Sequence, residues 1–169
     1  MSKLHKRAIV ISFVTLIGIL GAASLPARAE ETLKFRFVSH NTGVVTIDAA
    51  DGVDGHSFGA GKFVGIALFD DGRVGSVAYL ANFDYTKGSG TFSTFDTIKF
   101  DDGSILRFRA TGTATLEGAK TNFTEGKLEV VGGEGKYKGA SGTGVLTGTR
   151  LNSLAEGGDS YFESTLHLK

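Results

Sequence analysis

The chain has 169 residues, with 25 glycines and 13 phenylalanines but no cysteine, no tryptophan and a single proline. This length suits one domain, and the lack of cysteine excludes disulfides, thiolate nucleophiles and cysteine-bound metal sites. Basic and acidic residues number 18 each, which argues against a nucleic-acid binder, since such proteins normally have a basic excess. The hydrophobic content of 41% and the glycine excess predict a turn-rich globular β protein.

Residues 1–29 have the features of a signal peptide. A basic head ends at Arg7, the apolar run Ala8–Ala23 follows, and Ala-Arg-Ala at 27–29 forms a cleavage site. The run is short for a membrane span, which needs about 20 residues. We therefore expect cleavage, with an uncleaved anchor as the alternative. The mature chain, 30–169, would be periplasmic or secreted, without stable membrane anchoring, and would keep 14 basic and 18 acidic residues, a net charge of −4.

Alternation of apolar and polar residues continues through most of the mature chain and predicts β-strands. In chain order, the segments with this pattern are 33–37, 62–69, 77–83, 106–112, 127–130 and 161–168. The segment 62–69 is apolar on both faces, which is typical of a strand covered on two sides. Four segments between the strands are typical of hairpin turns: 70–72, 87–90, 101–103 and 156–159. Eight or nine strands in hairpin order are expected.

The predicted fold class is all-β, with a single barrel domain at 30–169 behind the signal peptide. An open sheet of this length would expose unpaired edges, and the mature chain has no proline to protect them. Closure into an antiparallel up-and-down barrel removes the edges. A β-sandwich is the alternative.

One face of the predicted barrel collects large apolar side chains. The candidate ligand-binding residues on this face are Phe35, Phe37, Tyr79, Phe83, Phe108 and Phe162. Inside a barrel these side chains form either a packed core or the wall of a cavity for an apolar small molecule. In the second case Tyr79 supplies a phenolic hydrogen-bonding group.

No catalytic or metal-binding motif accompanies this face. The histidines of the mature chain lack metal-ligand spacing, and the acidic turns lack the ligand pattern of a calcium loop. The glycine clusters lack the strand–helix frame of a hydrolase elbow or a nucleotide site. Arg107 and Arg109 share a strand face, where they either hold a ligand carboxylate or pair across the sheet with the charged segment 125–129. Catalytic residues stay unassigned, and no metal is predicted.

The segment Val130–Gly142 resembles the signature of the allene oxide cyclase and dirigent protein superfamily. In that signature V-x-G-G-T-G precedes an aromatic residue, an alanine and a glycine, and Glu134 stands here in place of the threonine. The matching residues are Gly132, Gly133, Gly135, Tyr137, Ala140 and Gly142. The segments 61–65 and 112–114 are also similar to barrel strands of the family, so the chain looks like a bacterial allene oxide cyclase-like barrel protein.

The resemblance implies an eight-stranded antiparallel barrel with an apolar cavity, often a homotrimer, that works without a metal or organic cofactor. Members hold a reactive molecule in one conformation while it cyclises or couples. We therefore expect an exported barrel that binds an apolar small molecule and guides its cyclisation or coupling. The alternatives are a non-catalytic carrier or envelope protein with a filled barrel, and an interaction module that assembles through its outer face. No nucleic-acid partner is expected.

Overall fold

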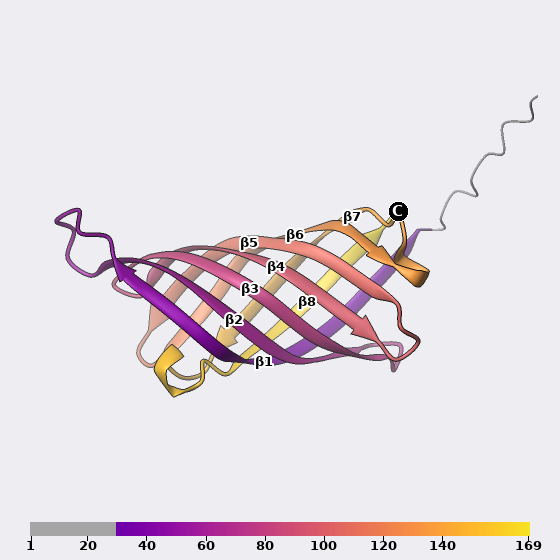
Figure 1. Cartoon of the computed structure of the whole chain (residues 1–169), viewed down its shortest axis with the longest axis horizontal. Coiled ribbons are helices and arrows are strands. Elements are labelled where there is room, and N and C mark those ends of the chain that lie inside the picture. The colour runs from indigo at the N-terminus through magenta and orange to yellow at the C-terminus, as the bar shows by residue number, and fades with distance from the viewer. Residues whose placement is uncertain (1–29) are drawn as a thin grey trace, which may run out of the picture.

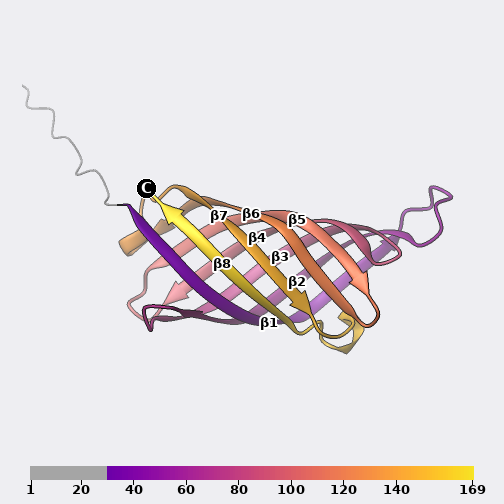
Figure 2. The ribbon, with the colours of Figure 1, turned by 180° about the vertical axis from the view of Figure 1, so that it is seen from behind.

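The computed structural model describes residues 30–169, which form a closed antiparallel barrel (Figure 1; Figure 2 shows it from behind). Each strand pairs with the next along the chain, and β8 pairs with β1. The strands are β1 (Glu31–Asp48), β2 (His56–Phe69), β3 (Val74–Thr86), β4 (Ser89–Phe100), β5 (Ile105–Glu117), β6 (Lys120–Glu134), β7 (Gly142–Arg150) and β8 (Ser160–Leu168). Short 3-10 helices are η1 (Gly135–Tyr137) and η2 (Leu154–Glu156). The predicted eight-stranded barrel is confirmed, and the sandwich is excluded.

The predicted signal peptide, 1–29, lies outside the described residues. Among residues 30–169, no helix has the length and apolar character needed to cross a membrane.

Tight turns join the strands at the predicted places. Gly72 and Gly103, at the two Asp-Asp-Gly turns, have φ angles of 88° and 81°, which favour glycine. Between β3 and β4, Lys87 and Gly88 both have positive φ, the geometry of a two-residue hairpin turn. Strands β4 and β7 were not among the predicted segments, because polar residues and glycines occupy part of their inward faces.

Alternation along each strand separates the interior from the exterior, as the sequence predicts. Several glycines stand on the inward face because aromatic rings pack directly over the backbone. A Cβ atom added at Gly59 would lie 1.9 Å from the ring of Phe83, and one at Gly148 would lie 2.3 Å from the ring of Phe162. The glycine excess of the chain therefore serves ring packing as well as turns.

The outer face of β2 is exposed. Ile66 and Leu68 keep 51% and 54% of their surface accessible to solvent. The prediction that 62–69 is covered on both faces is therefore wrong for the described chain. Within residues 30–169 no second layer of sheet or helix packs outside the barrel.

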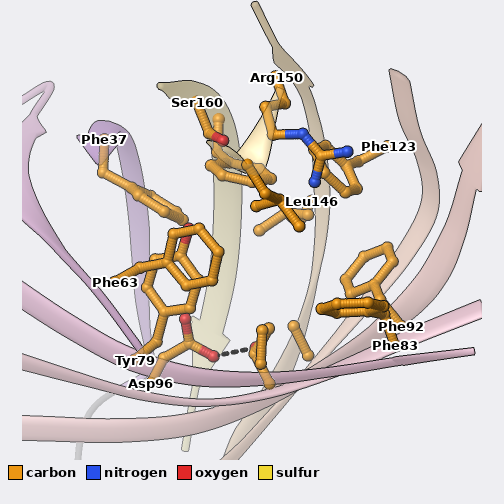
Figure 3. Close-up of a pocket in the computed structure, with 15 residues that line it drawn as sticks. Phe37, Phe63, Tyr79, Phe83, Phe92, Asp96, Phe123, Leu146, Arg150 and Ser160 are labelled. Atoms are coloured by element: carbon orange, nitrogen blue, oxygen red, sulfur yellow. Dashed lines mark hydrogen bonds between the residues drawn. The ribbon is translucent and has the colours of Figure 1, made fainter. Parts of the chain in front are cut away.

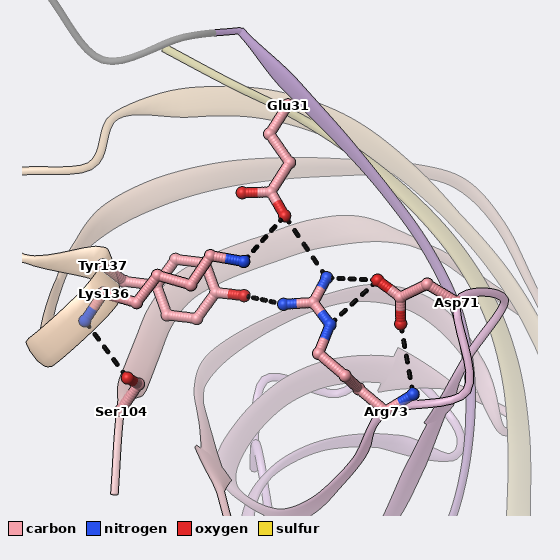
Figure 4. A network of polar contacts seen from close by, with 6 residues as sticks. All are labelled: Glu31, Asp71, Arg73, Ser104, Lys136 and Tyr137. Atoms are coloured by element: carbon pink, nitrogen blue, oxygen red, sulfur yellow. Dashed lines mark hydrogen bonds and ion pairs between the residues drawn. The ribbon is translucent and has the colours of Figure 1, made fainter. Parts of the chain in front are cut away.

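A cluster centred on Arg73 closes one end of the barrel (Figure 4). Arg73 donates a hydrogen bond of 2.6 Å to Tyr137 Oη and forms ion pairs with Asp71 at 2.5 Å and Glu31 at 3.3 Å. Its guanidinium carbon also lies 5.5 Å from the ring centroid of Phe100, within the range of a cation–π contact. Tyr137 belongs to η1 and is fully buried. The glycine-rich segment that carries the family resemblance thus closes this end of the barrel.

Candidate functional site

The opposite end of the barrel holds a small cavity with mainly aromatic walls (Figure 3). Its volume is about 40 Å³. The lining residues are Phe37, Phe63, Tyr79, Ala81, Phe83, Phe92, Thr94, Asp96, Ala110, Phe123, Leu146, Arg150, Leu154, Ser160 and Phe162. This space admits a few water molecules, whereas small-molecule sites usually measure roughly 300–1,000 Å³. Any larger ligand must displace side chains or the segment that covers the cavity.

The six candidate residues divide into two groups. Four of them line the cavity: Phe37, Tyr79, Phe83 and Phe162. The other two, Phe35 and Phe108, are each 1% exposed and lie with their ring centroids 6.2 Å apart in the solidly packed interior. The barrel interior is therefore a filled core in one part and a cavity in the other.

A buried carboxyl group faces the cavity from β4. Asp96 is 3% exposed and accepts a hydrogen bond from Thr94 Oγ1, which lies two residues earlier on the same strand face. Burial raises the pKa of Asp96 from 3.8 to about 7, and the bond from Thr94 opposes this only in part. Near neutral pH the protonated and the ionised forms of the Asp96 carboxyl group are therefore both populated. This is the protonation behaviour that a general acid or base needs.

Tyr79 lies beside Asp96, since the two residues are cross-strand partners on β3 and β4. The oxygen atoms of Tyr79 and Ser39 are 2.8 Å apart and form a hydrogen bond. Burial raises the pKa of Tyr79 well above its usual value of 10, and the neighbouring Asp96 adds to the effect. The phenol therefore stays neutral and can donate a hydrogen bond. Asp96 and Tyr79 together make one polar patch in an aromatic wall.

Arg150, the last residue of β7, extends toward the same cavity (Figure 3). Its Nη2 donates a hydrogen bond of 2.8 Å to Thr121 Oγ1, and its guanidinium carbon lies 5.9 Å from the ring centroid of Phe123. Burial lowers the pKa of Arg150 below its usual value, but the group keeps its charge at neutral pH. The cavity thus offers a cation and a titratable carboxyl group within aromatic walls.

The segment 151–159, which connects β7 to β8 and contains η2, forms the cover of the cavity. Leu154 of this cover lines the cavity directly. Asn41 holds the cover in place, because its Nδ2 donates to Leu154 O at 2.7 Å and its backbone N–H donates to Gly157 O at 2.8 Å. A single residue of β1 therefore ties this segment to the barrel wall through two hydrogen bonds.

A histidine clamp ties the loop between β1 and β2 to β3 at this end of the barrel. His56 Nδ1 lies 2.6 Å from Asp51 Oδ2, and His56 Nε2 lies 2.8 Å from Asp84 Oδ1. Both carboxylates are acceptors, so the two bonds exist together only when the ring carries both protons. The hydrogen bonds to Asp84 and Asp51 raise the pKa of His56 above 6.5.

The clamp predicts that the stability of the loop between β1 and β2 depends on pH. Stability from the charged ring is present below pH 6.5 and is lost as the pH rises through the raised pKa of His56. We expect amide hydrogen exchange in 49–55, corrected for intrinsic rates, to accelerate over that rise, and His56→Gln to abolish the change. His167→Gln, at an exposed position on β8, is the matched control. The same pH response in the His56→Gln protein would contradict the clamp.

The two arginines of the sequence analysis lie on the outer face of β5. Arg107 forms an ion pair of 2.5 Å with Glu134, and Arg109 lies opposite Glu129 in the register of β5 and β6. The guanidinium carbon of Arg109 is 4.9 Å from the ring centroid of Phe95. The predicted pairing of charged strands is confirmed, and neither arginine lines the cavity.

Of the polar residues that line the cavity, the sequence analysis named Tyr79 but missed Thr94, Asp96, Arg150 and Ser160. Asp96 and Thr94 were detectable, because Phe92, Asp96 and Phe100 share one face of an alternating strand, and an acidic residue on an apolar face is unusual. Arg150 carries no comparable signal, since it ends a strand whose other inward positions are mostly glycine.

No protein-family model matches the sequence, and no curated protein matches it. Among solved structures, the pterocarpan synthase dirigent protein PsPTS1 is similar, with 16% identity, a TM-score of 0.50 and coverage of 82% of this chain and 94% of that chain. The pterocarpan synthase dirigent protein GePTS1 is 16% identical, with a TM-score of 0.47 and coverage of 89% and 98%. A protein of unknown function from the DUF3224 family of Shewanella oneidensis MR-1 is 20% identical, with a TM-score of 0.39 and coverage of 81% and 94%. At such identities the likeness shows the fold alone, a dirigent-like barrel.

Proposed function

We propose that this protein is an exported barrel that binds a small, mainly apolar molecule beside Asp96 and Tyr79 and guides its cyclisation or coupling. The observation that carries the proposal is the buried carboxyl group of Asp96 against the aromatic cavity. A buried ionisable group destabilises a core unless it is paired with an opposite charge, and such groups concentrate at functional sites. A purely structural barrel would be more stable with an apolar residue at this position.

The chemistry follows from the wall of the cavity. Closely packed rings would hold a flexible ligand in one folded conformation, which lowers the entropic part of the barrier to ring closure or coupling. Asp96 would give or take a proton at a reacting oxygen, while the neutral phenol of Tyr79 donates a hydrogen bond to it. Arg150 would face an anionic or phenolic part of the ligand. The proton transfers use side chains of the chain itself, and for coupling the reactant would have to arrive already oxidised.

The fold supports this reading at a coarser level. PsPTS1, whose barrel is similar to that of this chain, is a dirigent protein described as a pterocarpan synthase. A relation to allene oxide cyclases rests on the sequence resemblance of Val130–Gly142 alone.

A non-catalytic carrier is the second candidate, and the small cavity favours it. A ligand that displaced side chains to enter a cavity of about 40 Å³ would be tightly enclosed and could hardly change its conformation. Native mass spectrometry of the protein purified from its own host tests both candidates, because a co-purified apolar ligand is expected in each case. A ligand that the protein returns unchanged favours the carrier, and a cyclised or coupled product favours catalysis. Absence of any bound small molecule in the purified protein would count against both.

Tyr79→Phe tests the polar patch. The change removes the phenol and leaves Ser39 Oγ buried without its 2.8 Å partner. We expect affinity for the co-purified ligand to fall roughly tenfold, about 1.4 kcal/mol, or turnover to fall by a similar factor. The double variant Tyr79→Phe with Ser39→Ala removes the unpaired hydroxyl and serves as the control for stability. Unchanged affinity and turnover in both proteins would remove Tyr79 from the proposed site.

A further inference from the structure

Arg150 differs from the other arginines of residues 30–169 in having no acidic partner. The other four either form an ion pair with a carboxylate or lie opposite a glutamate on the neighbouring strand. The cross-strand neighbours of Arg150 are Thr121 and Ser160, and no carboxylate of this part of the chain pairs with it. Its hydrogen-bond acceptor Thr121 is 1% exposed, so the barrel encloses part of the guanidinium group.

The carboxyl group of the cavity does not neutralise Arg150. Figure 3 shows the Asp96 carboxyl group and the Arg150 guanidinium group on opposite sides of the cavity. Asp96 accepts its hydrogen bond from Thr94, and near neutral pH it is partly protonated. The groups that raise the pKa of Arg150 against the effect of burial are the phenols of Tyr85 and Tyr79, and no carboxylate is among them. The cavity therefore has an excess of positive charge.

We propose that the ligand of the cavity is an aromatic monocarboxylic acid, with its carboxylate on Arg150 and its ring among the aromatic side chains of the wall. This assignment rests on the proposed function, because it names the class of molecule that the same cavity binds. An enclosed charge is costly unless it is paired, and a planar guanidinium group binds a carboxylate through two parallel hydrogen bonds. A neutral ligand would leave Arg150 unpaired, and a dianion would exceed its charge.

The walls of the cavity favour a ring over an aliphatic chain. Seven of the lining side chains are aromatic. Phe123 connects them to the cation, since its ring centroid lies 5.9 Å from the guanidinium carbon of Arg150 and 5.2 Å from the ring centroid of Phe162. Contacts between rings stabilise beyond the area that they bury, and a rigid ring loses less conformational freedom on binding than a flexible chain. Because the space measures about 40 Å³, a single ring also keeps the displacement of side chains small.

Three probes with the same number of carbon atoms test the class: phenylacetate, 2-phenylethanol and octanoate. Titration calorimetry at pH 6, where Asp96 is mostly protonated, measures their affinities for the natural protein. We expect phenylacetate to bind roughly tenfold or more tightly than the alcohol, because its hydrogen bonds to Arg150 are charge-assisted. Octanoate, which lacks the ring, should bind about threefold or more weakly than phenylacetate. Equal affinity for phenylacetate and the alcohol, or octanoate binding as tightly as phenylacetate, would overturn the proposal and leave the proposed function standing.

Arg150→Gln separates the contribution of the charge from that of the ring. We expect the affinity for phenylacetate to fall roughly tenfold or more, while the affinity for 2-phenylethanol, which also reports that the variant is folded, changes by less than about threefold. Arg150→Lys keeps the charge without the planar fork and should keep part of the preference for the acid. Arg36→Gln is the matched control, because the Arg36 side chain is 64% exposed on the outer face of β1.

The results distinguish failure of this proposal from failure of the proposed function. If Arg150→Gln still preferred phenylacetate tenfold, the carboxylate would bind elsewhere and the proposal would be wrong. If neither aromatic probe bound the natural protein but a neutral molecule co-purified with it, the proposal would fail and the proposed function would stand. If neither probe bound and no molecule co-purified, both would fail.

Discussion

Asp96→Asn is expected to stabilise the protein above pH 7 and to flatten its stability between pH 4 and pH 7. The carboxyl group has a pKa of about 7 in the folded protein against an ordinary value of 3.8. Since one pKa unit corresponds to about 1.36 kcal/mol, burial of the ionised form costs about 4 kcal/mol of folding stability at pH 8. Asparagine has nearly the same shape and can still accept the hydrogen bond from Thr94 Oγ1.

The sign follows from proton binding. Between pH 3.8 and 7 the folded protein holds a proton on Asp96 that the unfolded chain has already lost. The free energy of unfolding therefore falls as the pH rises through this window and levels off above it. The neutral asparagine side chain removes that contribution, so the two proteins should have similar stability near pH 4 and should differ most above pH 7.

Guanidinium unfolding at closely spaced pH values measures the difference. Asp54→Asn is the matched control, because the Asp54 side chain is 90% exposed and should change stability by less than about 0.5 kcal/mol. A variant at position 96 that is less stable than the natural protein at pH 8 would show that the ionised carboxyl has a compensating partner. It would also remove the main physical reason for placing function at this residue.

The barrel was largely predictable because its determinants are local. Inward residues such as Phe35, Phe37 and Tyr79 recur with period two, and Asp-Gly pairs mark the turns that separate strands. These two signals specify the register of each hairpin, and closure follows from the need to pair the remaining edges. The resemblance at Val130–Gly142 was also informative about the fold, since that segment closes one end of the barrel through Tyr137.

The division of the interior into a filled part and a cavity was not predictable. Phe35 and Phe83 occupy the same kind of inward position in their strands, and only the packing of neighbours across the barrel distinguishes them. Phe35 stacks on Phe69 with ring centroids 4.9 Å apart, whereas Phe83 borders the cavity. Such contacts join residues distant in sequence, so periodicity alone assigns both residues to the same face. The partial opening beside β1, whose residues after Ser39 pair with β2 but not with β8, was not predictable either, because it depends on the unequal lengths of the paired strands.

Alanine substitutions at these two phenylalanines should separate the two parts of the interior. Phe35→Ala is expected to cost about 3–5 kcal/mol, because its ring is enclosed on all sides and the void cannot relax easily. Phe83→Ala should cost less, because the lost ring merges with a space that water already can enter. The free energy of unfolding should be measured at pH 5, where Asp96 is mostly protonated. At this pH the cost of burying the ionised carboxyl group does not affect the comparison.

The same pair of variants bears on ligand entry. A cavity of about 40 Å³ limits binding by volume, so removal of the Phe83 ring should raise the affinity for phenol, a probe with one ring and one hydroxyl group. Phe83→Leu keeps most of the bulk and serves as the matched control. If Phe83→Ala destabilised the protein as much as Phe35→Ala and bound phenol no better, the cavity end would be part of the packed core. Asp96 would then be a buried acid without access to a substrate, and the filled-barrel alternative would be favoured.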